Sequence, residues 1–284
     1  MTEVVTGVAR SERARARRGL AVFVPLVVVA EVACLGLLTA TGSPATLYLL
    51  LWSVALASVA ARLVTREGFR DVSFRWGGPR STSWAIVGVV VPLVVGTLSF
   101  GAVWLSGLVP FAPPGGAPGL LGALAVGLVL GVVGATGEEI GWRGYVLTRL
   151  VDAGVPRPVL VHAVLWGLWQ LPLIFAGLLA VDHPDPVVAA VIFMAATVPM
   201  GFLLARMRLS SGSLWPGVVA RGAWTGIVAG AFWPAAAAGG ASAAVWVGAE
   251  SGLLVAVALG MVAVVVCAGT WTYRRTPEDP GTSL

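Results

Sequence analysis

The chain has 284 residues, of which 58% are hydrophobic and only 11% are charged. A soluble protein of this size would carry about twice that share of charge, so the composition excludes an ordinary soluble fold. The formal net charge of +5 does not indicate a nucleic-acid-binding protein, because the arginines follow the ends of the apolar runs instead of forming one basic face.

Eight apolar runs are long enough to cross a bilayer as helices, for which about 20 residues are needed. In chain order they are residues 20–42, 44–64, 82–108, 119–137, 158–180, 186–205, 213–233 and 245–271. The sequence therefore predicts an all-α fold, a polytopic membrane bundle of about eight transmembrane helices that pack as one domain over residues 20–273. We expect residues 1–19 to form a disordered polar tail and residues 274–284 to form a second, short polar tail.

The distribution of arginine predicts how the bundle is oriented. Seventeen of the 18 basic residues lie at alternate ends of the apolar runs, and the segments at the other ends contain none. By the positive-inside rule, both termini are predicted on the cytoplasmic side of the cell membrane. The arginine-rich loop of residues 65–80 also contains aromatic residues, and we expect it to lie against the lipid headgroups.

The fourth run carries a packing signal. Small residues recur at every fourth position, at Ala123, Gly127, Gly131 and Ala135. Such a ridge lets two membrane helices approach closely. Because the ridge leads directly into Glu138 and Glu139, we expect these carboxylates to face the interior of the bundle.

The densest polar cluster follows this ridge. Glu139 and Arg143 are four residues apart and can pair on one helical face, which leaves Glu138 without a local partner. A carboxylate inside a membrane segment marks a candidate functional site. The alternative is a hydrated helix end with both glutamates in water, but the adjacent Trp142 favours a packed turn.

The fifth run contains a second candidate. Trp166 and Gln170 share a helical face, and Pro172 predicts a kink close to Gln170. Gln170 either satisfies a carbonyl group freed by the kink or belongs to a site, and the sequence leaves both interpretations open. His162 lies two turns earlier and is predicted to be an interfacial histidine.

The eighteenth arginine, Arg221, lies about two turns into the seventh run. Placing an arginine at such a depth costs about 2.5–3.5 kcal/mol. We therefore expect Arg221 to face the bundle and to find an acceptor there, in preference to extending toward the headgroups. Thr225 lies one turn further along the same face.

Together, the three segments resemble the CPBP intramembrane metalloprotease family, the group of CAAX prenyl proteases and of Abi or bacteriocin-processing proteins. The resemblance extends over about residues 119–228. The first motif of that family, EExxxR, is complete here as Glu138, Glu139 and Arg143. The resemblance implies that the first glutamate, together with histidines of the later motifs, activates a water molecule with or without a bound metal.

The second and third motifs depart from the family pattern. Trp166 and Gln170 occupy an aromatic-xxx-His motif with Gln in place of His, and Arg221 and Thr225 occupy a His-xxx-Asn motif with Arg and Thr. Arg221 stays protonated and has no lone pair to offer a metal, which its positive charge would repel. At this former metal-ligand position it can pair with Glu138 or Glu139 instead, and we hypothesise that an Arg221–Glu138 ion pair substitutes structurally for the metal. Since a catalytic zinc usually has three protein ligands, no metal and no other cofactor is expected.

The sequence thus predicts a family member with a lost metal site and a non-catalytic binding, regulatory or immunity-type role. Its expected partners are the lipid bilayer and a peptide or partner membrane helix in the cleft. The alternative is an active intramembrane endopeptidase that cleaves a hydrophobic or prenylated peptide with Glu138 as general base, and zinc would be expected in that case. A transporter is less well supported, because a second, inverted set of broken helices is missing.

Overall fold

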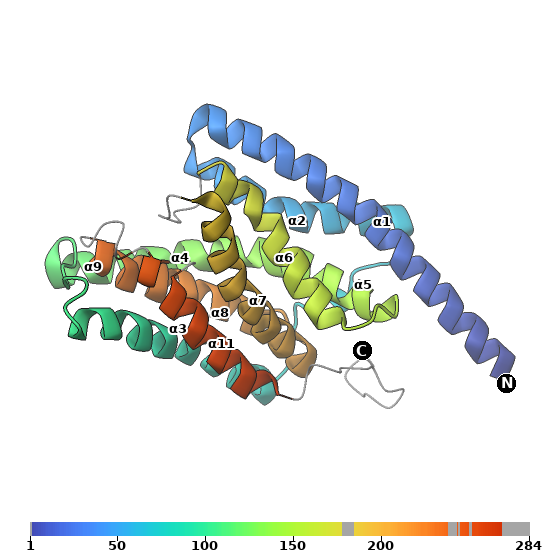
Figure 1. Ribbon diagram of the computed structural model, residues 1–284. Coiled ribbons are helices and arrows are strands. Elements are labelled where there is room, and N and C mark those ends of the chain that lie inside the picture. The colour runs from blue at the N-terminus through green and yellow to red at the C-terminus, as the bar shows by residue number, and fades with distance from the viewer. Residues whose placement is uncertain (1, 178–184, 238–242, 244, 250–251, 269–284) are drawn as a thin grey trace.

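The computed structural model describes residues 2–177, 185–237, 243, 245–249 and 252–268 (Figure 1). None of these residues is in a strand, and long helices dominate. Six of the helices are long and apolar enough to cross a membrane. The prediction of an all-α, polytopic membrane bundle is confirmed. The predicted second tail, residues 274–284, lies outside the described residues.

The helices follow the predicted runs closely. They are α1 (Thr2–Thr41), α2 (Pro44–Thr65), α3 (Pro79–Leu105), α4 (Gly116–Gly141), α5 (Leu147–Asp152), α6 (Pro158–Phe175), α7 (Pro186–Ser211), α8 (Trp215–Trp224), α9 (Trp233–Ala236) and α11 (Leu253–Cys267). A short 3-10 helix, η1, spans Arg70–Val72, and two π-helical segments, η2 and η3, span Trp142–Val146 and Thr225–Phe232. Proline in the first turn begins α2, α3, α6 and α7, where its missing N–H costs no hydrogen bond.

The seventh predicted run crosses the whole bundle as one continuous helix from Trp215 to Ala236, although Arg221 lies within it. At one end, the backbone N–H of Leu214 donates to the carbonyl of Ser73 in the loop between α2 and α3. At the other end, the N–H of Ala112 in the loop between α3 and α4 donates to the carbonyl of Ala235. The eighth run contains the shorter apolar helix α11, which packs against α3 and α7.

The arginine-rich segments gather at one end of the bundle, called here the basic end. Arg17 of α1 donates to the carbonyl of Ala153 after α5, at 3.5 Å. Arg80 at the start of α3 donates to the carbonyl of Ser210 at the end of α7, at 3.4 Å. These contacts join four helices at the end where the alternation of arginines placed them.

The first segment of the chain differs from the prediction. Residues 1–19 were expected to form a disordered tail, but α1 begins at Thr2 and continues without interruption into the first span. In Figure 1 this dark-blue end of α1 projects beyond the other helices. The physical reason is its content of Ala, Arg and Glu between Ala9 and Arg18, which are strong helix formers.

The predicted ridge of small residues on α4 packs against η3. A Cβ atom added to Gly131 would lie 2.6 Å from the Cβ of Thr225, and one added to Gly127 would lie 2.9 Å from the Cα of Gly226. Only glycine allows this approach of the two backbones. The ridge is confirmed as the contact that sets the end of α4, with its two glutamates, against the helix that carries Arg221.

Candidate functional site: a buried charge cluster around Trp166

Three helices bring the predicted residues together in the interior. Glu138 and Glu139 lie in the last turn of α4, Trp166 in the middle of α6, and Arg221 in α8. Glu138 and Glu139 are 2% and 1% exposed, and Arg221 is 8% exposed. The hydrated helix end considered for the two glutamates is therefore wrong, because both are buried.

Glu138 has a partner on each of its carboxylate oxygens. The indole Nε1 of Trp166 donates to Oε2 at 2.8 Å, and Nη2 of Arg221 lies 3.5 Å from Oε1. The predicted ion pair between Arg221 and Glu138 is thus present. A buried charge requires such compensation, since desolvation of an isolated ion costs several kcal/mol.

Trp166 also contacts two guanidinium groups. The Cζ atom of Arg143 lies 4.1 Å from the centroid of the Trp166 ring system, and that of Arg221 lies 5.3 Å away. Both distances are within the range of cation–π interactions. The indole therefore connects both arginines through its ring and Glu138 through its N–H. We call Glu138, Glu139, Arg143, Arg221 and Trp166 the charge cluster.

Glu139 and Arg143 form the predicted pair four residues apart. Arg143 Nη1 lies 3.0 Å from Glu139 Oε1, and both side chains are at most 1% exposed. This contact is an ion pair, but it does not have the geometry of a hydrogen bond. Glu139 is also packed tightly, because a Cβ atom added to Gly217 of α8 would overlap its carboxylate. The cluster thus contains two carboxylates and two guanidinium groups, and its formal charge is zero.

The sequence reasoning missed the two π-helical segments beside the cluster. The segment η2 begins three residues after Glu139, and η3 begins four residues after Arg221. Such segments shift the register of a helix and are frequent at functional sites. The glycines in and around both segments, among them Gly141, Gly144 and Gly226, were the only available signal.

Gln170 and Thr225 form hydrogen bonds to their own helices. The side-chain amide of Gln170 donates to the carbonyl of Trp166 at 3.4 Å, and the hydroxyl of Thr225 donates to the carbonyl of Arg221 at 3.1 Å. Of the two interpretations of Gln170, this contact favours the structural one. Each of these residues supports the backbone beside a member of the charge cluster.

His162 is not at an interface, contrary to the prediction. Its side chain is fully buried, and its ring packs edge-on against Trp142 of η2 at 6.2 Å between centroids. Among the described residues, neither ring nitrogen has a hydrogen-bond partner. His162 lies near the start of α6, where Trp142 of η2 packs against its ring.

The described residues do not form a metal site. No group of three or more His, Cys, Asp or Glu among them is arranged to hold a metal ion. Both oxygens of Glu138 already have partners, one of them the cation Arg221. This donor set does not fit zinc, which takes three protein ligands in catalytic sites.

A small cavity adjoins the cluster between α6, α7, α8 and α11. Trp166, Thr197, Arg221 and Trp224 are among the residues that line it. Its volume of about 10 Å³ accommodates about one water molecule. Thr197 and Arg221 supply polar groups for such a water, whereas a peptide side chain does not fit without movement of the helices.

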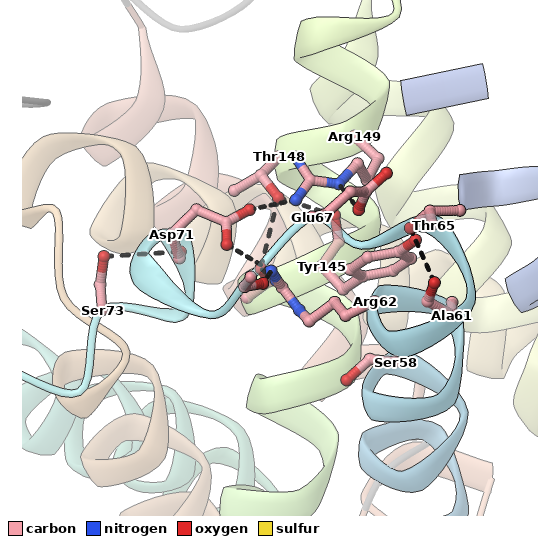
Figure 2. A network of polar contacts seen from close by, with 12 residues as sticks. Ser58, Ala61, Arg62, Thr65, Glu67, Asp71, Ser73, Tyr145, Thr148 and Arg149 are labelled. Atoms are coloured by element: carbon pink, nitrogen blue, oxygen red, sulfur yellow. Dashed lines mark hydrogen bonds and ion pairs between the residues drawn. The ribbon is translucent and has the colours of Figure 1, made fainter. Parts of the chain in front are cut away.

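A second polar network, also missed from the sequence, lies at the basic end (Figure 2). Arg62 at the end of α2 donates to the carbonyl of Gly144 in η2 at 2.8 Å and pairs with Asp71 of η1. Arg149 of α5 pairs with Asp71 as well. This network supports η2, the segment that carries Arg143 of the charge cluster.

Comparison with known proteins identifies a family for the region that contains the charge cluster. Residues 120–227 match the family described as type II CAAX prenyl endopeptidase, Rce1-like. The predicted resemblance to the CAAX prenyl protease group is confirmed, over nearly the same residues. No curated protein and no solved structure was found to match the chain.

Proposed function

We propose that this chain, a membrane protein of the Rce1-like type II CAAX prenyl endopeptidase family, is a non-catalytic member that binds a hydrophobic or prenylated peptide, or a partner membrane helix, without cleaving it. A single observation carries the proposal. Arg221, a permanent cation, stands at a motif position for histidine and pairs with Glu138 at 3.5 Å.

The chemistry of the charge cluster opposes hydrolysis. A general base must have a lone pair directed at a water molecule, but Glu138 accepts from Trp166 on one oxygen and faces Arg221 with the other. The guanidinium group of Arg221 has only donors and repels a metal cation. Neither route to an activated water is supported by these residues, so we infer that the protein binds no catalytic zinc and requires no other cofactor.

The same cluster is suited to a structural role in a binding protein. Its two ion pairs neutralise four buried charges. The pair between Arg221 and Glu138, together with the hydrogen bond from Trp166, holds α4, α6 and α8 together. The adjoining cavity accommodates about one water molecule, so a bound peptide would lie outside the cluster and would not reach Glu138. The proposed partner would therefore be held by the helix bundle and remain intact.

We further infer that the bundle lies in the cell membrane with its basic end on the cytoplasmic side. The positive-inside rule supports this orientation, because arginines gather at that end and not at the other. Both termini would then be cytoplasmic, as the even number of predicted spans requires.

The alternative function, an active intramembrane endopeptidase, has one observation in its favour. The complete first motif, Glu138, Glu139 and Arg143, is buried in the interior of the bundle. In that case Glu138 would act as general base, and a conformational change would have to separate it from Arg221.

One experiment distinguishes the two functions. The purified protein in nanodiscs is titrated with a fluorescent farnesylated peptide, with the same peptide lacking the farnesyl group as control. We expect saturable binding of the farnesylated peptide and no cleavage, together with less than stoichiometric zinc. Cleavage that is lost in Glu138→Ala would establish the endopeptidase instead, and absence of binding would refute the proposed partner class.

A second experiment tests the explanation for the missing metal. The triple variant Gln170→His, Arg221→His and Thr225→Asn restores the family's residues at the second and third motifs. We expect this variant to gain zinc affinity by isothermal titration, whereas Gln170→His alone should not. If the triple variant gains none, the substitutions at these positions do not explain the missing site.

A further inference from the structure

The loop between α2 and α3, together with the first residues of α3, forms a segment across the basic end of the bundle. We call residues 66–80 the strap. Its backbone is held by neighbouring helices: Nη2 of Arg208 in α7 donates to the carbonyl of Asp71 at 2.6 Å, and the N–H of Leu214 donates to the carbonyl of Ser73 at 3.3 Å. The strap is therefore a fixed surface and not a free loop.

Both acidic residues of the strap point inward, as Figure 2 shows. Glu67 accepts from Nε of Arg149 at 2.9 Å, and its side chain is only 4% exposed. Asp71 pairs with Arg62 and with Arg149, which belong to α2 and α5. Arginines of α2 and α5 thus neutralise the negative charges of the strap on its side that faces the bundle.

The outward side of the strap is consequently basic and aromatic. Its exposed large side chains are Arg66, Arg75, Arg80, Phe69, Phe74 and Trp76. The aromatic residues are 43–53% exposed, whereas the side chains of Glu67 and Asp71 are 4% and 33% exposed and pair with arginines of the bundle. A surface of this composition at the end of a membrane bundle lies at the level of the lipid headgroups.

The backbone at Arg66 has an unusual conformation for a residue other than glycine. Arg66 ends α2 in the left-handed conformation, with φ of 54°. Glycine is the usual residue at this position of a helix end, because other residues are strained there. Arg157, before α6, shares this conformation and this exposure, so variants at the two positions can be matched for it.

We propose that the strap binds the headgroups of anionic phospholipids. The exposed guanidinium groups pair with lipid phosphates, and the aromatic rings enter the interface between headgroups and acyl chains. Each basic residue close to an anionic surface strengthens binding roughly five-fold, equivalent to about 1 kcal/mol. This inference does not depend on the proposed function of the charge cluster.

The test compares two double variants with the same loss of charge. Arg66→Gly with Arg75→Gln removes two arginines from the strap. The control, Arg157→Gly with Arg13→Gln, removes two exposed arginines next to the loop between α5 and α6, where the Arg13 guanidinium lies close to Gly154. Arg157 has φ of 51°, so each double variant also relieves one left-handed residue.

Lipid binding is measured by native mass spectrometry, with phosphatidylglycerol and phosphatidylcholine of identical acyl chains. We expect the wild type to prefer phosphatidylglycerol and the strap variant to lose roughly 30-fold in affinity for it, as two arginines predict. The control variant should lose clearly less than the strap variant, because its two arginines lie outside the proposed lipid site. Unchanged circular dichroism of both variants shows that they fold.

Three results would overturn the proposal. Equal losses in the two variants would mean that net charge alone governs lipid binding. Equal affinity of the wild type for the two lipids would show that the strap does not recognise anionic headgroups. Full displacement of phosphatidylglycerol by millimolar inorganic phosphate would identify a site for free anions in place of a lipid surface.

Discussion

Replacing Arg221 by methionine tests whether the ion pair with Glu138 stabilises the bundle. Methionine retains most of the side-chain volume and removes only the cation. Glu138, 2% exposed, then keeps the hydrogen bond from Trp166 to its carboxylate but loses the adjacent positive charge. We expect the variant to lose about 3–5 kcal/mol of unfolding free energy, the usual cost of removing one partner of a buried ion pair.

The geometry sets the size of the coupling between the two residues. Unit charges 3.5 Å apart interact by about 5 kcal/mol at an effective dielectric constant of about 20. Desolvation of both groups offsets a large part of this attraction. The double variant Arg221→Met with Glu138→Gln should therefore lose less than the sum of the single losses, by about 2–4 kcal/mol.

The assay is reversible unfolding in mixed micelles, with all four members of the double-mutant cycle measured under the same conditions. Arg157→Met serves as control, because Arg157 is exposed and a surface substitution changes stability by less than about 0.5 kcal/mol. Additive losses in the cycle would refute the coupling between Arg221 and Glu138. Full stability of Arg221→Met alone would refute the need for a cation beside Glu138.

The sequence predicted the main contacts of the charge cluster because buried charges have few possible partners. Glu139 and Arg143 pair at a helical spacing that is visible in the sequence, and the pair was found at 3.0 Å. Arg221 had to find a carboxylate at its own depth in the membrane. The two glutamates that follow the small-residue ridge of α4 were the nearest candidates, and the ridge does pack against the helix of Arg221.

Other contacts between helices that are distant in sequence were not predictable. The hydrogen bond from Trp166 to Glu138 depends on the rotation of α6 relative to α4, which no local pattern specifies. The burial of His162 depends on Trp142 in η2, whose π-helical register changes the direction of the following side chains. Asp71 and Arg149 are 78 positions apart in the sequence, so their pairing follows from the packing of the whole basic end.

Two further substitutions test the close packing of the charge cluster and the network below the strap. Gly217→Ala should destabilise the protein by about 1–3 kcal/mol in the same unfolding assay, because the added methyl group overlaps the carboxylate of Glu139. Gly260→Ala is the matched control, since a Cβ atom there meets nothing within 4 Å, and alanine should be neutral or stabilising by up to about 1 kcal/mol. Arg149→Met should lower the free energy of unfolding by about 3–5 kcal/mol, because it leaves the 4% exposed carboxylate of Glu67 without its cation. Arg75→Met, on the outer side of the strap, should lower it by less than about 0.5 kcal/mol. Similar losses for the two arginine variants would mean that the inward ion pairs of the strap contribute no more than its exposed charges.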